Sequence, residues 1–172
     1  MKLKSRKLIL FGMLGSLTAI GQMALSFLPN VEVVTLFIIL FSLIYGKEAL
    51  YIVCTFVLLM GLLHGFGLWW FGYVILWPIL SILTVILKKK LMNNYLLLSI
   101  YSGAFGALFG FFYAIPYGIF GGLNAGITYW ISGIPYDVVH GVGNYFLMIL
   151  LGKRLFKVFN KLNDRYSNNT LL

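Results

Sequence analysis

Long apolar stretches, separated by four short clusters of basic residues, dominate this sequence. Of its 172 residues, 61% are hydrophobic and only 10% are charged, and the mean hydropathy is +0.96. A water-soluble domain of this size cannot bury so much apolar surface in its core. The sequence therefore predicts an integral membrane protein, with the lipid bilayer as the solvent for most of its side chains.

The positions of the basic residues predict how the chain crosses the bilayer. All 13 Lys and Arg residues fall in four clusters: Lys2, Lys4, Arg6 and Lys7; Lys47; Lys88, Lys89 and Lys90; and Lys153, Arg154, Lys157, Lys161 and Arg165. Basic loops stay in the cytoplasm, so each apolar stretch between clusters must cross the membrane an even number of times. Three helical hairpins meet this condition and place both termini on the cytoplasmic side.

We expect one domain over residues 1–172, an all-α bundle of six membrane-spanning helices. The expected spans are 8–28, 33–45, 48–63, 68–87, 95–113 and 137–152, followed by a cytoplasmic tail at 153–172. The segment 114–136 is apolar but rich in Gly and Pro, which argues against a seventh span. We interpret it as a partly helical outer connection, with a short interfacial or re-entrant helix around 123–131.

Several classes of function are not expected. The net charge of +9 does not indicate nucleic-acid binding, because the basic residues are confined to the clusters. The first apolar run is long enough for a full span and lacks a small-residue cleavage site, so we expect a membrane helix rather than a secretory signal. The single cysteine, Cys54, falls within a span and offers no disulfide framework. No phosphate-binding glycine loop or nucleophile elbow occurs, so the chain is not expected to hydrolyse ATP by itself.

Three polar residues align on the last expected span. Asp137, His140 and Asn144 are three and four residues apart, so they project from one face of a helix. Polar groups inside a bilayer are costly and normally face the bundle interior or a wet cavity. One interpretation is structural, with Asp137 capping its helix and the other two binding a neighbouring helix. The other is a ligand pocket open to the outside, because residue 137 lies at the outer end of its expected span.

Aromatic residues near the outer ends of other spans would complete such a pocket. The candidates are Trp69, Trp70, Tyr73, Tyr113, Tyr129 and Trp130, with Tyr136 beside Asp137 and His64 at the end of the third span. The simpler interpretation of the tryptophans at the start of the fourth span is an interfacial aromatic belt. No metal site is expected, because His64, His140 and Asp137 lie on different spans or lack a close ligand pattern.

Small residues form a stripe on the first expected span. Gly12 and Ser16 are four residues apart, as are Gly15 and Ala19. Such pairs let two helices approach closely in lipid. The stripe is consistent with packing inside the chain and with docking onto a partner subunit.

These features together resemble the substrate-binding S components of energy-coupling factor (ECF) transporters, which are small prokaryotic vitamin importers. The resemblance spans nearly the whole chain and depends on the six spans, the basic N-terminus and the small-residue stripe. Its most specific part is the stretch 129–144, Tyr-Trp-Ile-Ser-Gly-Ile-Pro-Tyr-Asp-x2-His-x2-Gly-Asn. The first helix departs from the family's alanine-x3-alanine pattern by using Gly12, Ser16, Gly15 and Ala19.

The resemblance implies a high-affinity capture subunit in a prokaryotic plasma membrane, without a cofactor or an enzyme activity of its own. It would bind a vitamin or related micronutrient, such as cobalamin, pyridoxine or a thiamine precursor. The small-residue stripe would dock onto a transmembrane coupling subunit, and two cytoplasmic ATPase subunits would supply the energy. Two alternatives remain open: an intramembrane enzyme that uses Asp137 and His140 as an acid–base pair, and a structural membrane subunit.

Overall fold

The computed structural model describes residues 5–168, and the regular secondary structure of this part of the chain is entirely helical, without strands. Its helices are α1 (Ser5–Ala24), α2 (Val34–Tyr45), α3 (Ala49–His64), α4 (Leu68–Asn93), α5 (Tyr95–Ala107), α6 (Phe109–Gly121), α7 (Leu123–Leu147) and α8 (Lys153–Asn168). A 3-10 turn, Gly46–Glu48, joins α2 to α3, and a π-helical turn, Met148–Gly152, joins α7 to α8. Lys2 and Lys4 of the first basic cluster and residues 169–172 of the expected tail lie outside the described residues.

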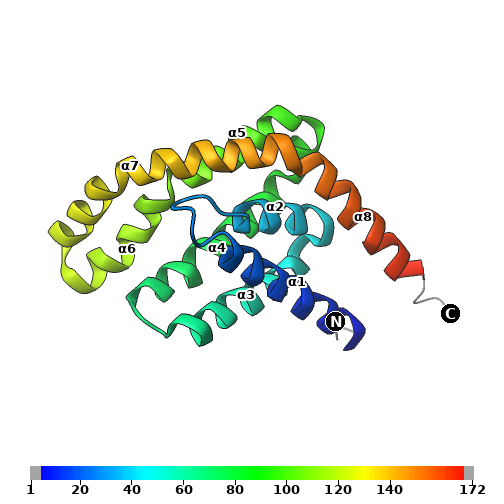
Figure 1. Ribbon diagram of the computed structural model, residues 1–172, viewed down its shortest axis with the longest axis horizontal. Helices are drawn as coiled ribbons and strands as arrows, with labels where there is room; N and C mark the ends of the chain where they lie inside the picture. The colour runs from blue at the N-terminus through cyan, green and yellow to red at the C-terminus, as the bar shows by residue number, and fades with distance from the viewer. Residues whose placement is uncertain (1–4, 169–172) are drawn as a thin grey trace.

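Five helical segments are long and apolar enough to cross a membrane. They are Ser5–Ala24, Val34–His64, Leu68–Asn93, Tyr95–Gly121 and Leu123–Tyr166. The second of these contains both α2 and α3, which Figure 1 shows as two separate helices. The break falls at Gly46, whose positive φ of 60° suits a residue without a side chain. The chain therefore has the character of an all-helical, multi-pass membrane protein.

The basic clusters gather at one end of the bundle, where the two ends of the described chain also lie (Figure 1). Lys7 of α1 bonds Glu48 of the α2–α3 turn, with 2.6 Å between Nζ and Oε2. Leu91, which follows Lys90, lines the same small cavity as Lys153. We call this the basic end, and we call the opposite end, with the turns at 65–67 and 122, the far end.

The segment 114–136 differs from the expected outer connection. α6 continues to Gly121, the chain reverses at Gly122 with φ 86°, and α7 then runs without a break through Pro135 to Leu147. The expected spans 95–113 and 137–152 are accordingly parts of a much longer helical hairpin. The expectation of a short helix around 123–131 was wrong because Gly and Pro were read as helix breakers, as they are in water.

Close helix contact explains the glycines of this hairpin. A Cβ atom on Gly126 would lie 2.9 Å from Cα of Gly118 and 3.1 Å from the carbonyl oxygen of Ala114. The two helices therefore touch backbone to backbone, which favours helix association in lipid. Pro116 and Pro135 each remove one backbone donor, a loss that membrane helices tolerate when neighbouring groups satisfy the freed carbonyl.

The core centres on α2 and α4. Nine of the twelve residues of α2 are buried, and Trp77 of α4 is 1% exposed. The rings of Phe56, Tyr73 and Phe109 lie within 6 Å of the Trp77 ring, so an aromatic cluster fills the space between α3, α4 and α6. Trp77 thus belongs to the protein interior and not to an interfacial belt.

Candidate binding site

The polar residues predicted on one face of the last span do face the interior. Asp137, His140 and Asn144 all lie on α7 and are 7%, 5% and 2% exposed. They do not bond one another, and each meets a different partner. The spacing of three and four residues therefore identified a buried polar face, as helical geometry requires.

Glu32, in the loop between α1 and α2, is the partner of His140. Its Oε1 lies 3.0 Å from His140 Nε2, and it also accepts bonds from the Thr35 amide at 2.8 Å and the Thr35 hydroxyl at 2.5 Å. Asn144 Nδ2 in turn donates to Thr35 Oγ1 at 3.1 Å. These bonds fix the α1–α2 loop and the start of α2 to the middle of α7. Glu32 and Thr35 are not among the site residues predicted from the sequence, although Glu32 is one of only four acidic residues in the chain.

The Glu32 side chain is 15% exposed and remains acidic. Burial by itself raises the pKa of a carboxyl group, but the hydrogen bond and charge of His140, together with the two Thr35 bonds, outweigh it and hold the Glu32 pKa below its ordinary value. Glu32 is therefore a carboxylate at neutral pH. It places one negative charge beside the buried face of α7.

Asp137 does not cap its own helix, because α7 begins far upstream at Leu123. Its Oδ1 instead accepts a bond of 2.8 Å from the amide of Gly110, in the first turn of α6. Amides in a first turn lack partners within their helix, and the dipole there favours negative charge. Asp137 thus caps α6 from a neighbouring helix, which corrects the structural interpretation made from the sequence.

A cavity of about 350 Å³ opens at the far end of the bundle. Its lining comes from the ends of α1 and α3 and the start of α4: Gln22, Met23, Ser26, Met60, His64, Trp69 and Tyr73. Gln22 Nε2 donates to the Tyr73 hydroxyl at 2.6 Å, which joins α1 to α4 across the cavity wall. Sites for small molecules have volumes of about 300–1,000 Å³, so this cavity has the size of a small ligand site.

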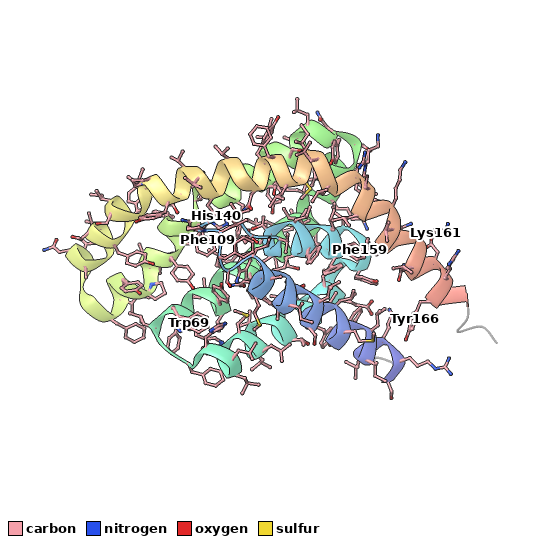
Figure 2. The ribbon with its side chains drawn as sticks, in the orientation of Figure 1. Trp69, Phe109, His140, Phe159, Lys161 and Tyr166 are labelled. Carbon is pink, nitrogen blue, oxygen red and sulfur yellow. The ribbon has the colours of Figure 1, made fainter. Side chains whose placement is uncertain are left out.

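A row of rings leads from this cavity to the polar face of α7. The ring centroids of Tyr73 and Tyr113 are 6.1 Å apart, those of Tyr113 and Phe109 are 5.0 Å apart, and those of Phe109 and His140 are 4.7 Å apart. Figure 2 shows His140 and Phe109 side by side in the middle of the bundle, with Trp69 nearer the far end. The cavity and the polar face therefore border the same aromatic cluster.

Three buried polar atoms around this cluster have no hydrogen-bond partner among residues 5–168. They are Gln22 Oε1, Trp77 Nε1 and Asp137 Oδ2. More than nine in ten buried polar groups in proteins are satisfied, so unpaired groups concentrated around one cluster require an explanation. Of the three residues only Gln22 lines the cavity, so Gln22 Oε1 is the one unpaired atom placed to accept a bond from a bound molecule, whereas Trp77 and Asp137 lie in the packed interior.

The structure brings together some of the predicted site residues. His64, Trp69 and Tyr73 line the cavity, and Tyr113 joins them to His140 through Phe109. No local pattern marks Gln22, Met23, Ser26 or Met60 as site residues, because their proximity depends on how α1 and α3 pack.

The other predicted aromatic residues lie elsewhere. Trp70 donates its Nε1 to the Val57 carbonyl at 2.9 Å and packs between α3 and α4. Tyr129 stacks on Tyr117 of α6 with 4.0 Å between ring centroids, and Trp130 packs against Phe111. Tyr136 is 61% exposed. These four side chains therefore do not meet the cavity, although Tyr129 and Trp130 do hold α6 to α7.

The small-residue stripe of α1 divides into two faces. Gly15 and Ala19 are buried, and a Cβ atom on Gly15 would lie 2.6 Å from the Thr55 Cβ of α3. A Cβ atom on Gly12 would meet nothing within 4 Å, and Ser16 bonds the Gly12 carbonyl at 2.9 Å. One pair therefore packs inside the chain, and the other lies on a partly exposed face.

Residues 5–168 contain no group of three His, Cys, Asp or Glu side chains that could hold a metal ion. Comparison with known proteins gives no assignment either: no family model, no curated protein and no solved structure matches this chain. The class that the fold itself defines is an all-helical, multi-pass membrane protein.

Proposed function

We propose that this protein is the solute-capture subunit of a vitamin importer of the ECF type, located in a prokaryotic plasma membrane. The observation that carries the proposal is the far-end cavity of about 350 Å³, which is lined by Trp69, Tyr73 and Gln22 and into which Gln22 brings a buried Oε1 atom without a hydrogen-bond partner. A ligand that donates a hydrogen bond would satisfy Gln22 Oε1. Apolar walls with a few placed polar groups are the usual construction of a small-molecule site.

The size and lining of the cavity favour a particular kind of solute. A volume of about 350 Å³ lies near the lower limit for small-molecule sites, which suits one or two rings. Pyridoxine or a thiamine precursor fits this limit, whereas the corrin of cobalamin is far larger. Trp69 and Tyr73, whose ring centroids are 5.2 Å apart, would provide the flat contact surfaces.

The basic end supports the orientation that capture from outside requires. The four basic clusters belong on the cytoplasmic side by the positive-inside rule. In our proposal α1, α2, α3, α4, the α5–α6 pair and α7 make six passes, so that the far end and its cavity face outward. The coupling subunit and two ATPase subunits would act from the cytoplasmic side, and the partly exposed Gly12 and Ser16 face of α1 would contact the coupling subunit.

The two alternatives have less support. An acid–base pair needs Asp137 and His140 to act together, but the first bonds Gly110 and the second bonds Glu32. A purely structural subunit would not require a cavity with an unpaired polar atom in its wall. The geometry therefore favours capture of a solute over catalysis or scaffolding.

The test is mass spectrometry of the purified protein under non-denaturing conditions, first as isolated and then with added pyridoxine, thiamine, riboflavin and biotin. We expect one small molecule to bind without ATP. Trp69→Phe should weaken this binding because Trp69 lines the cavity. Trp70→Phe is the matched control, because Trp70 does not line the cavity and packs between α3 and α4. Failure to detect any bound vitamin, or equal losses in the two variants, would contradict the proposal.

A further inference from the structure

A second cavity lies at the basic end, between α2, α4, α5 and α8. Its volume is about 260 Å³, and its lining is Leu43, Leu91, Met92, Asn93, Tyr95, Leu98, Gly152, Lys153 and Phe156. The inner wall is apolar, and the polar side chains come from the α4–α5 junction and the start of α8. Because this end carries the basic clusters, the cavity lies at the level where a bilayer meets the cytoplasm.

Tyr95 fixes the position of Lys153 in this cavity. The Tyr95 hydroxyl donates to the carbonyl of Met148 and lies 3.2 Å from that of Ile149, and it accepts a 2.9 Å bond from the Lys153 amide. A side chain inserted into the helical hydrogen-bond ladder produces the wider π-helical turn seen at 148–152. The cavity thus has a built rim, with a defined backbone position for its lysine.

The charged residue in the lining is a lysine, and the charges nearby along α4 and α8 are also positive. Lys153 lines the cavity, and five more basic residues lie within a few positions of its lining residues along α4 and α8: Lys88, Lys89, Lys90, Arg154 and Lys157. Within residues 5–168, the ion pairs involve only Lys7 with Glu48 and His140 with Glu32, so these six have no carboxylate partner. Such a rim attracts an anion, and a basic pocket between helices at the cytoplasmic face is suited to an anionic lipid headgroup.

The amphipathic helix α8 places this rim at the membrane surface. Phe159 packs against Phe41 of the core at a centroid distance of 5.0 Å, whereas Val158 and Leu162 are 51% and 54% exposed. Figure 2 shows Phe159 turned toward the bundle and Lys161 on the outer side of α8. Exposed apolar groups interleaved with lysines are typical of a helix that lies in the headgroup region.

We propose that the cavity at the basic end binds one anionic phospholipid. Its phosphate would lie at the Lys153 rim, and an acyl chain would lie along the apolar wall formed by Leu91, Leu98 and Phe156. Charge complementarity selects an anionic headgroup, and the apolar wall selects a lipid over a free phosphate. This site is separate from the solute cavity and depends only on insertion of the bundle in a membrane.

The test compares phosphatidylglycerol with phosphatidylcholine of the same acyl chains, each added to the purified, delipidated protein and detected by non-denaturing mass spectrometry. We expect tighter binding of phosphatidylglycerol. Lys153→Gln should weaken it about fivefold, which corresponds to the loss of one lysine near a headgroup. Lys161→Gln is the matched control on the same helix and should leave it unchanged, because Lys161 does not line the cavity. The glutamine variant keeps the backbone amide that bonds Tyr95, so its fold should be preserved.

Three results would overturn the lipid proposal. The first is equal binding of the two lipids, and the second is equal weakening by Lys153→Gln and Lys161→Gln. The third is displacement of phosphatidylglycerol by glycerol 1-phosphate at equal concentration, which would show a phosphate site without a role for the acyl chain.

Discussion

Replacing Glu32 with Gln tests the bond network that fixes the α1–α2 loop to α7. The carboxylate accepts three bonds, at 2.8 and 2.5 Å from Thr35 and at 3.0 Å from His140. Gln keeps the shape of the side chain but has a single acceptor oxygen. The other terminal atom of the Gln amide is an NH₂ group, which would face a donor that now bonds a carboxylate oxygen.

The expected cost follows from burial and charge. Glu32 is 15% exposed, and a hydrogen bond to a charged group contributes about 1.5–3 kcal/mol. For a chain of this length each kcal/mol shifts the melting temperature by about 2–4 °C, so Glu32→Gln should lower it by about 3–12 °C.

Glu48→Gln is the matched control at the basic end. Glu48 bonds Lys7 at 2.6 Å, but the two side chains are 26% and 43% exposed. Surface ion pairs contribute about 0–1 kcal/mol, so this variant should melt within about 4 °C of the unchanged protein. Melting curves in one detergent, followed by tryptophan fluorescence, give both values. Equal shifts in the two variants would refute the claim that Glu32 is part of a buried network.

Three further predictions use the same melting assay. Gly110→Ala should destabilise the protein by about 1–3 kcal/mol, because the added Cβ atom would lie 2.4 Å from the Asp137 Oδ2 atom of α7. Gly133→Ala should stabilise it by about 0.5–1 kcal/mol, because the added Cβ atom would meet nothing within 4 Å. The reverse order of stabilities would contradict the packing of α6 on α7. The Glu32 pKa lies below its ordinary value of 4.5, so the carboxylate stabilises the fold above that pH and this stabilisation is lost as the pH falls further. Glu32→Gln should therefore show a smaller loss of stability in acid than the unchanged protein, and an equal loss would contradict the role of Glu32. Ser42 and Ser81 share one buried hydrogen bond of 2.8 Å, so replacing either serine with Ala should cost about 1–3 kcal/mol of stability. The double replacement should cost no more than a single replacement, because it leaves no hydroxyl without its partner. Additive losses would show that the two hydroxyls do not depend on each other.

The membrane character and the polar face of α7 could be predicted from sequence because both depend on local properties. Hydropathy over about 20 residues decides whether a helix can enter lipid, and a spacing of three and four residues decides which side chains share a face. Asp137, His140 and Asn144 are therefore buried together as predicted.

The partners of those residues could not be predicted, because they come from distant parts of the chain. Glu32 and His140 are 108 positions apart, and Gly110 and Asp137 meet only because a break at Leu108 starts a new helix. Trp70 and Tyr136 show the same limit. Their aromatic character marks them as candidates, but the orientation of each helix about its axis decides where they point. Trp70 lies in a contact between α3 and α4, and Tyr136 is exposed.

The segment 114–136 was misassigned because Gly and Pro act differently in lipid. In water these residues mark turns, since exposed backbone can bond solvent. In a membrane the backbone must satisfy itself, so a helix continues through Pro135 and glycine becomes a contact surface, as at Gly118 and Gly126. Only Gly122, with its positive φ, is a turn.

Capture from outside requires that the solute cavity opens to the outside and that the basic end lies in the cytoplasm. Single cysteines at Ser26, which lines the cavity, and at Asn93, which lies at the basic end, report on it directly in a Cys54→Ala background. In this orientation a membrane-impermeant maleimide should label position 26 in intact cells and position 93 only after the membrane is permeabilised. Labelling of position 93 in intact cells, with position 26 protected, would contradict both the orientation and capture from outside.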